Sequence, residues 1–138
     1  WPIYTEPWDH ATHSKAMGMK KILVVDDDTI VLLILRDALG RVQPDYEIVT
    51  AKDGREALTL LRDDRFDLLV TDLGLPGITG ITLTEEAREL HAELPVVWIT
   101  AYGCHNVCAE SDELGVCCCL DKPVDIERIR EAVRAALQ

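Results

Sequence analysis

Short apolar runs alternate with segments of helical periodicity from Lys20 to the end of the 138-residue chain, and this alternation limits the fold more than any other feature. Strands that are separated by helices in this way form a parallel sheet with crossover helices. The pattern therefore predicts an α/β fold with five parallel strands and five helices, and a chain of this length can build it around a single core. The strands are expected over 22–25, 48–51, 68–71, 96–99 and 116–120, and the helices over 29–39, 54–63, 81–91, 106–114 and from 126 onward.

Residues that begin and end helices support these boundaries. Asp28, Asp53 and Asp125 each precede a predicted helix, where an aspartate side chain can accept hydrogen bonds from free N–H groups of the first turn. Gly40 and Gly115 follow predicted helices, and glycine often ends a helix because it adopts the left-handed conformation without strain. We therefore expect Gly40 and Gly115 to be helix ends.

Composition argues against two kinds of partner. The net charge of −11, from 25 acidic and 14 basic residues, argues against direct binding of nucleic acid, which requires a clustered basic surface. No apolar run approaches the roughly 20 residues that are needed to span a bilayer, so no membrane partner is expected. The five cysteines do not follow the spacing of a small secreted disulfide protein, and a reducing cytoplasm is the expected location.

The beginning of the chain differs from the rest. Residues 1–18 contain no apolar segment of the kind that a signal peptide has, and their Trp, Pro and His residues are scattered among polar ones. We interpret 1–18 as an added leader, a tag or a linker, and 19–138 as the folded domain.

Polar residues follow four of the predicted strands where each strand should end: Asp26, Asp27, Asp72, Thr100 and Lys122. Right-handed crossovers make all the strands point the same way, so these side chains should meet at one edge of the sheet, where α/β proteins bind ligands. Three carboxylates suit a hard cation such as Mg²⁺. A cation at this edge would also offset the charge of a phosphoryl group while a carboxylate attacks phosphorus. The sequence thus predicts a site for a divalent cation and a phosphoryl group.

Four motifs together resemble the receiver domain of two-component response regulators, over about residues 20–138. They are ValValAspAspAsp at 24–28, AspLeuGlyLeuProGlyIleThrGly at 72–80, ThrAla at 100–101 and LysPro at 122–123. The resemblance implies a flavodoxin-like sheet with strand order 2-1-3-4-5 and helices on both faces. It also implies a phosphorylation-dependent signalling switch and not an enzyme that turns over a metabolite.

The resemblance assigns roles to individual residues. Asp72 would accept a phosphoryl group from a phosphohistidine on a sensor histidine kinase or a phosphotransfer protein. Asp26, Asp27, Asp72 and the main-chain carbonyl of Gly74 would hold Mg²⁺. The domain would catalyse only its own phosphorylation from small donors and its own dephosphorylation.

The output side of the predicted switch contains one departure from the family. Thr100 and Lys122 would be drawn toward the new phosphoryl group, and this would change the surface formed by 106–114, 116–120 and the last helix, where a target protein or output domain binds. Most receivers have an aromatic residue or a histidine three positions before the lysine, whereas this chain has Cys119. A thiol lacks the ring area of an aromatic switch, so the usual relay is not expected at Cys119.

Two other functions compete with the switch. One alternative is an interaction module on a receiver scaffold that is not phosphorylated, or that responds to a metal or to redox state. Cys104 and Cys108 are one helical turn apart, and Cys117 and Cys119 would share a side of a strand, which is what suggests the metal or redox response. The thiols can equally be small apolar side chains that fill the core. A haloacid-dehalogenase-like phosphohydrolase is the other alternative, but residues 26–30 do not have the spacing of that family.

The first predicted helix has too many apolar residues for one buried face. Residues 30–35 are all apolar and cannot all face the core. We expect an exposed patch that includes Val31 and Leu35 and that docks the kinase or phosphotransfer protein. A homodimer through the same patch and a cover formed by the leader are the alternatives.

Overall fold

The computed structural model describes residues 19–42 and 46–138, so the interpretation of 1–18 as a leader lies outside the described residues. The strands are β1 (Lys20–Val25), β2 (Tyr46–Ala51), β3 (Leu68–Asp72), β4 (Val96–Thr100) and β5 (Cys118–Asp121). The helices are α2 (Thr29–Val42), α3 (Gly54–Asp63), α4 (Gly80–Leu90), α5 (Cys108–Leu114) and α6 (Ile126–Ala136), with a 3₁₀ turn, η2 (Cys104–Val107), before α5.

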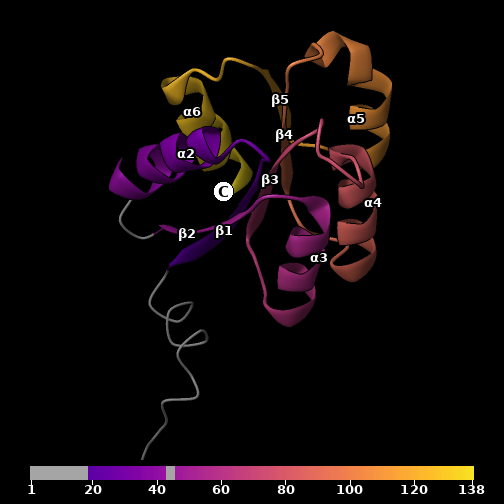
Figure 1. Ribbon diagram of the computed structural model, residues 1–138, viewed down its shortest axis with the longest axis horizontal. Coiled ribbons are helices and arrows are strands. Elements are labelled where there is room, and N and C mark those ends of the chain that lie inside the picture. Colours follow the sequence, from indigo (N-terminus) through magenta and orange to yellow (C-terminus); the bar gives the residue numbers. More distant parts are fainter. Residues whose placement is uncertain (1–18, 43–45) are drawn as a thin grey trace, which may run out of the picture.

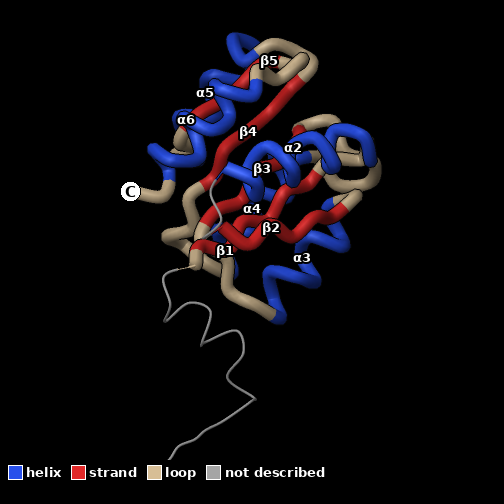
Figure 2. Tube along the Cα trace, turned by 90° about the vertical axis from the view of Figure 1, so that its left-hand side faces the viewer, coloured by secondary structure: helices blue, strands red, loops and turns tan. Residues whose placement is uncertain are grey.

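All five strands are parallel, in the order β2-β1-β3-β4-β5, which confirms the flavodoxin-like topology. Figure 1 shows α2 and α6 on one side of the sheet and α3, α4 and α5 on the other. Figure 2 shows the strands side by side in a twisted sheet. The carboxyl ends of β1, β3, β4 and β5 therefore meet at one edge.

The core has two parts, one on each face of the sheet. Every residue of β3 and β4 is buried, as expected for central strands that are covered by helices on both faces. One cluster lies under α3 and α4 and is built around Leu69, Leu83 and Trp98. The other lies under α2 and α6 and is built around Val70 and Ile129.

Three aspartates begin helices as predicted. Asp53 accepts a hydrogen bond from the N–H of Glu56 at 2.8 Å. Asp125 accepts from Glu127 at 2.8 Å, and Asp28 accepts from Ile30 at 2.9 Å. Each carboxylate satisfies N–H groups that have no partner within the helix itself.

Gly115 ends α5 as predicted, whereas the expectation for Gly40 is wrong. Gly115 has the left-handed backbone conformation, with φ of 65°. The described residues with positive φ do not include Gly40, and α2 continues past it to Val42. Glycine is tolerated inside a helix at a cost of about 1 kcal/mol, so its presence alone does not end α2.

The segment before the last strand also differs from the prediction. Strand β5 begins at Cys118 and not at Val116, because the N–H of Val116 is donated to the carbonyl of Ser111 at 3.0 Å and so is used to close α5. Cys117 is exposed and lies outside the strand, although its N–H donates to the carbonyl of Val96 at 2.8 Å. The predicted helix over 106–114 is divided into η2 and α5.

Helix α5 is short, and hydrogen bonds from Arg88 of the neighbouring helix α4 hold its end. None of its residues is buried. The guanidinium of Arg88 on α4 donates to the carbonyl of Leu114 at 2.7 Å and to that of Gly115 at 3.2 Å. These bonds satisfy carbonyl groups that the end of a helix leaves free.

The apolar run on α2 corrects one predicted patch residue. Leu32, Leu35 and Leu39 face the core at the i, i+3, i+7 spacing of one helix face, so Leu35 is buried and cannot be part of an exposed patch. Val31 is half-buried at the edge of that face. None of the described helices has the length and apolar character that crossing a membrane requires.

Candidate phosphoryl and cation site

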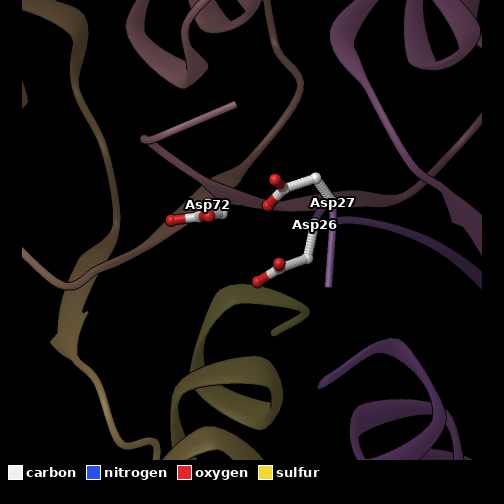
Figure 3. A group of neighbouring side chains, drawn as sticks. All are labelled: Asp26, Asp27 and Asp72. Carbon is white, nitrogen blue, oxygen red and sulfur yellow. The ribbon is translucent and has the colours of Figure 1, made fainter. Parts of the chain in front are cut away.

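The sheet edge brings together all five polar residues that the sequence singled out. Asp26 and Asp27 follow β1, Asp72 and Thr100 are the last residues of β3 and β4, and Lys122 comes directly after β5. Figure 3 shows the carboxylates of Asp26, Asp27 and Asp72 gathered around one point. Residues far apart in the chain thus form one polar site because parallel strands end at the same edge.

Three carboxylates form the acidic part of the site. One oxygen from each of Asp26, Asp27 and Asp72 lies within 4.8 Å of the others. Asp26 and Asp72 are buried, whereas Asp27 is exposed. Within residues 19–42 and 46–138, this is the only group of three or more His, Cys, Asp or Glu residues that is close enough to hold a metal ion.

The Asp26 carboxylate has one well-bonded and one poorly bonded oxygen. Its Oδ1 accepts the N–H of Asp28 at 2.9 Å. Its Oδ2 lies 2.9 Å from Nζ of Lys122, yet it is buried and receives no well-directed hydrogen bond from the described part of the chain. Burial raises the pKa of Asp26, and the nearby charge of Asp72 adds to this effect, although Lys122 and the Asp28 N–H oppose it. A divalent cation would satisfy this oxygen, so the residues fit a magnesium site.

Lys122 supplies the positive charge of the site. Its Nζ lies 2.9 Å from Asp26 Oδ2 and 3.2 Å from Asp72 Oδ2. Burial alone would lower the pKa of Lys122, but the carboxylates of Asp26 and Asp72 outweigh this effect and raise it. The Lys122 side chain therefore remains an ammonium group held between two carboxylates. The peptide bond between Lys122 and Pro123 is cis.

The main chain around Asp72 is tightly fixed. The N–H of Gly74 donates to Asp72 Oδ1 at 3.3 Å, and the Thr71 hydroxyl donates to the Asp72 carbonyl at 2.9 Å. A Cβ atom on Gly80 would lie only 2.2 Å from that same carbonyl oxygen. Sequence reasoning did not identify the contribution of Thr71 or Gly80, although Gly80 closes the motif that begins at Asp72.

Thr100 presents its hydroxyl at the same edge from the neighbouring strand. The residue is fully buried, and its Oγ1 accepts the N–H of Tyr102 at 2.9 Å. Because Oγ1 is the acceptor in this bond, the hydroxyl hydrogen is available to donate to another oxygen. The structure thus holds this hydroxyl at the carboxyl end of β4, next to the strand that ends in Asp72.

The cysteines do not form a metal-binding group: Cys104 lies near the end of β5, where its N–H donates to the Asp121 carboxylate at 2.8 Å, but no three thiols of the described residues are close enough to share an ion. Cys104 and Cys119 are half-buried, and Cys108 and Cys117 are exposed. Burial raises the pKa of both the Cys104 and the Cys119 thiol, and the Asp121 carboxylate adds to the effect. Metal binding and thiol oxidation require the thiolate, so these surroundings do not favour a metal- or redox-responsive module.

Replacing Asp26 by Asn should stabilise the cation-free protein at neutral pH. Because the folded-state pKa of Asp26 is raised, protonation favours folding below the unfolded-state pKa, and this contribution is lost as pH rises through the folded-state pKa. Asp26→Asn keeps a neutral side chain at every pH. In EDTA, its urea midpoint should exceed that of the wild type at pH 7.5, and the difference should shrink as the pH is lowered toward about 4.

Asp27→Asn is the matched control for this measurement. The Asp27 side chain is exposed, so its charge stays in contact with water and costs less folding free energy than a buried charge. We expect a smaller gain in the urea midpoint for this variant. Equal gains for the two variants, or a gain for Asp26→Asn that is independent of pH, would show that burial of the charge is not the cause.

Comparison with known proteins identifies a family that this chain matches. The sequence pattern of one protein family, the response regulator receiver domain, matches residues 22–134 of this chain. The response regulator protein PilR of Pseudomonas aeruginosa is 37% identical over 122 residues, which cover 88% of this chain and 27% of PilR. Sporulation initiation phosphotransferase F of Bacillus subtilis is 33% identical over 121 residues, which cover 88% of this chain and 96% of that protein. The chain therefore spans about a quarter of the first relative and nearly all of the second.

A solved structure supports both the fold and the chemistry of the edge. The response regulator protein TrrA of Thermotoga maritima, solved in complex with Mg²⁺-BeF, matches with a TM-score of 0.77 and 30% identity. The match covers 86% of this chain and all of that one. A protein of the same fold thus binds Mg²⁺, and the acidic group described above contains the oxygen ligands that this ion prefers.

Proposed function

Because the chain belongs to the response regulator receiver domain family, we propose that it is a Mg²⁺-dependent switch in which Asp72 accepts a phosphoryl group from a phosphohistidine. Receiver domains are switches in phosphorylation-based signalling, generally not enzymes, and they interact with histidine kinases or phosphotransfer proteins and with output domains. The observation that carries the proposal is the contact of Lys122 with both Asp26 and Asp72, at the point where three carboxylates meet.

The transfer step uses the Asp72 carboxylate as the nucleophile. One of its oxygens forms a bond to phosphorus while the bond from phosphorus to the imidazole nitrogen of the donor breaks, and the electron pair leaves with that nitrogen. A Mg²⁺ ion held by Asp26, Asp27, Asp72 and the Gly74 carbonyl would offset the negative charge on the phosphoryl oxygens.

Lys122 and Thr100 complete the site after transfer. The Lys122 ammonium lies between Asp26 and Asp72, and a phosphoryl group on Asp72 offers it a more highly charged partner. The Thr100 hydroxyl can donate to a phosphoryl oxygen while it still accepts from Tyr102. The resulting displacement of the strand ends biases a conformational equilibrium at α5, β5 and α6.

Intact mass measurement tests the proposal. We expect phosphoramidate with Mg²⁺ to add the mass of one phosphoryl group, and we expect the same incubation with EDTA to add none. Neutral hydroxylamine should remove the added mass, because it cleaves an acyl phosphate. The folded protein without any mass gain in Mg²⁺ would contradict the proposal.

The docking surface for the phosphodonor is proposed on α2 and the loop after β5. Ile30, Leu33 and Ile34 are 65%, 64% and 49% exposed, which is unusual for three large apolar side chains so close together. A groove of about 440 Å³ lies beside Ile34 and is lined at its other side by Lys122 and Pro123. Because the groove reaches Lys122, an apolar helix of a kinase or phosphotransfer protein bound there would bring its histidine close to the acceptor site.

A charged substitution on this surface should block the protein donor but not the small donor. We expect Ile34→Glu to reduce the rate of phosphotransfer from a phosphorylated histidine kinase by about 10² or more, because the change removes a central apolar contact. Phosphorylation by phosphoramidate should remain within about twofold of the wild-type rate, because Ile34 is outside the group of residues around phosphorus.

Leu90→Glu is the matched control for the docking surface, because Leu90 is an exposed leucine, 40% accessible, on α4. The histidine kinase used in this assay is chosen beforehand as the one that transfers its phosphoryl group fastest to the wild-type protein. Equal losses for Ile34→Glu and Leu90→Glu, or no loss for either, would place the docking surface elsewhere.

A further inference from the structure

A large buried ring lies next to the position where the family usually has its aromatic switch. Trp98 in β4 is fully buried and pairs in the ladder with Cys119 of β5 and with Thr71 of β3. It belongs to the core cluster that includes Leu73 and Leu83 and against which Cys119 packs. The aromatic volume that is absent at Cys119 is therefore present one strand closer to Asp72.

A chain of buried hydrogen bonds joins this ring to the main chain of Gly80 and Leu73, and Gly80 packs on the Asp72 carbonyl. The indole Nε1–H of Trp98 donates to Thr84 Oγ1 at 2.9 Å, and the Thr84 hydroxyl donates to the carbonyl of Gly80 at 2.8 Å. The N–H of Gly80 donates to the Leu73 carbonyl at 3.0 Å. Gly80 also packs directly on the Asp72 carbonyl, where a Cβ atom would lie at 2.2 Å.

The same ring is on the strand that carries Thr100. Trp98 and Thr100 are two residues apart in β4, so their side chains lie on the same face of the sheet. A displacement of Thr100 toward a phosphoryl group would therefore act on the part of β4 that carries the indole. Thr84 is on α4, so its bond to Trp98 connects the movement of β4 to the helix that begins at Gly80.

We propose that Trp98 and Thr84 are positioning residues that couple the main chain of Asp72 to strand β4 and to Cys119. They hold the loop between Asp72 and Gly80 in place for the attack on phosphorus. They also transmit the displacement of Thr100 to the side of the sheet that α4 and α5 cover. The pair thus supplies the coupling that an aromatic ring at Cys119 would otherwise give. This inference rests on the proposed phosphorylation of Asp72.

The first measurement is made on the wild-type protein, and a substitution in the pair serves only to assign the signal. The indole N–H signals of the three tryptophans are recorded by ¹H–¹⁵N NMR, and the signal of Trp98 is the one that Trp98→Phe removes. We expect excess phosphoramidate with Mg²⁺ to shift this signal in the wild type. The signal should stay unchanged in Asp72→Asn under the same conditions.

The second measurement separates a positioning role from a merely structural one. Thr84→Val keeps the shape of the side chain but removes the hydroxyl, whereas Thr84→Ser keeps the hydroxyl. We expect Thr84→Val to slow phosphorylation by phosphoramidate about tenfold, because small displacements of a reacting group have effects of this size or larger. Thr84→Ser should restore the rate to within about twofold, and the affinity for Mg²⁺ should be unchanged in both variants.

Each outcome decides for or against the proposal. An unshifted Trp98 signal in wild-type protein that does gain the phosphoryl mass would overturn the coupling while leaving the proposed function intact. A wild-type rate in folded Thr84→Val, or an equal loss in Thr84→Ser, would overturn the positioning role. If Thr84→Val does not fold, the wild-type NMR shift and the Thr84→Ser rate still decide. Absence of any mass gain in the wild type would instead refute the proposed function.

Discussion

Asp72→Asn should abolish the gain of phosphoryl mass that the wild-type protein shows with phosphoramidate and Mg²⁺. The substitution retains the size of the side chain but replaces the attacking carboxylate with an amide, which is a very weak nucleophile at phosphorus. We expect the rate to fall by at least about 10³, a loss typical of removing the group that forms the covalent bond. Intact mass spectrometry over a time course measures the loss directly.

Asp112→Asn is the matched control, because Asp112 is an exposed aspartate on α5. This variant should be phosphorylated at the wild-type rate. Peptide mapping of the wild-type phosphoprotein should locate the group on the peptide that contains Asp72. A phosphoryl group found on Asp26 or Asp27, or retained in Asp72→Asn, would refute the assignment of the acceptor.

Gly80→Ala should cause the largest loss of stability from a single added methyl group. The new Cβ atom would lie 2.2 Å from the Asp72 carbonyl oxygen and 2.7 Å from Leu73 Cα, so backbone must move to make room. Overpacking of this kind costs about 3 kcal/mol. We expect the urea midpoint to fall with little change in the slope of the transition, and phosphorylation to slow because the main chain of Asp72 is displaced.

Gly40→Ala makes the same chemical change at a helical position that has room. The nearest atom to its new Cβ would be Ile48 Cγ1 at 3.8 Å, an ordinary contact, and Gly40 lies within α2. Alanine is preferred over glycine inside a helix, so this variant should be more stable than the wild type by about 0.5–1 kcal/mol. A destabilised Gly40→Ala together with a neutral Gly80→Ala would contradict both close-contact arguments.

The order of strands and helices and the site at the sheet edge could be predicted from the sequence because both depend on local patterns. Apolar runs of strand length, aspartates at helix starts and polar residues at strand ends each leave a local signal. The right-handed rule for crossovers then places Asp26, Asp72, Thr100 and Lys122 together without any knowledge of their contacts. The structure confirms the sheet order that this reasoning requires.

The errors in prediction come from features that only packing decides. Six consecutive apolar residues on α2 do not reveal which of them face the core, so Leu35 was wrongly assigned to the exposed patch. Gly40 has the same sequence context as a helix end, but one glycine costs a helix only about 1 kcal/mol, and α2 continues past it. The bond from Trp98 to Thr84 joins residues 14 apart and has no local signal at all.

The attachment of α5 has a consequence for how this side of the molecule fluctuates. The helix buries none of its residues, and the guanidinium of Arg88 holds its last turn. Segments with so little buried surface open locally at a much lower free energy than the whole domain, so we expect the backbone amides of α5 to exchange with deuterium well before those of β3 and β4. A signal that reaches this helix would then be expressed as a change in the fraction of time for which α5 is folded, and a partner would bind the folded fraction.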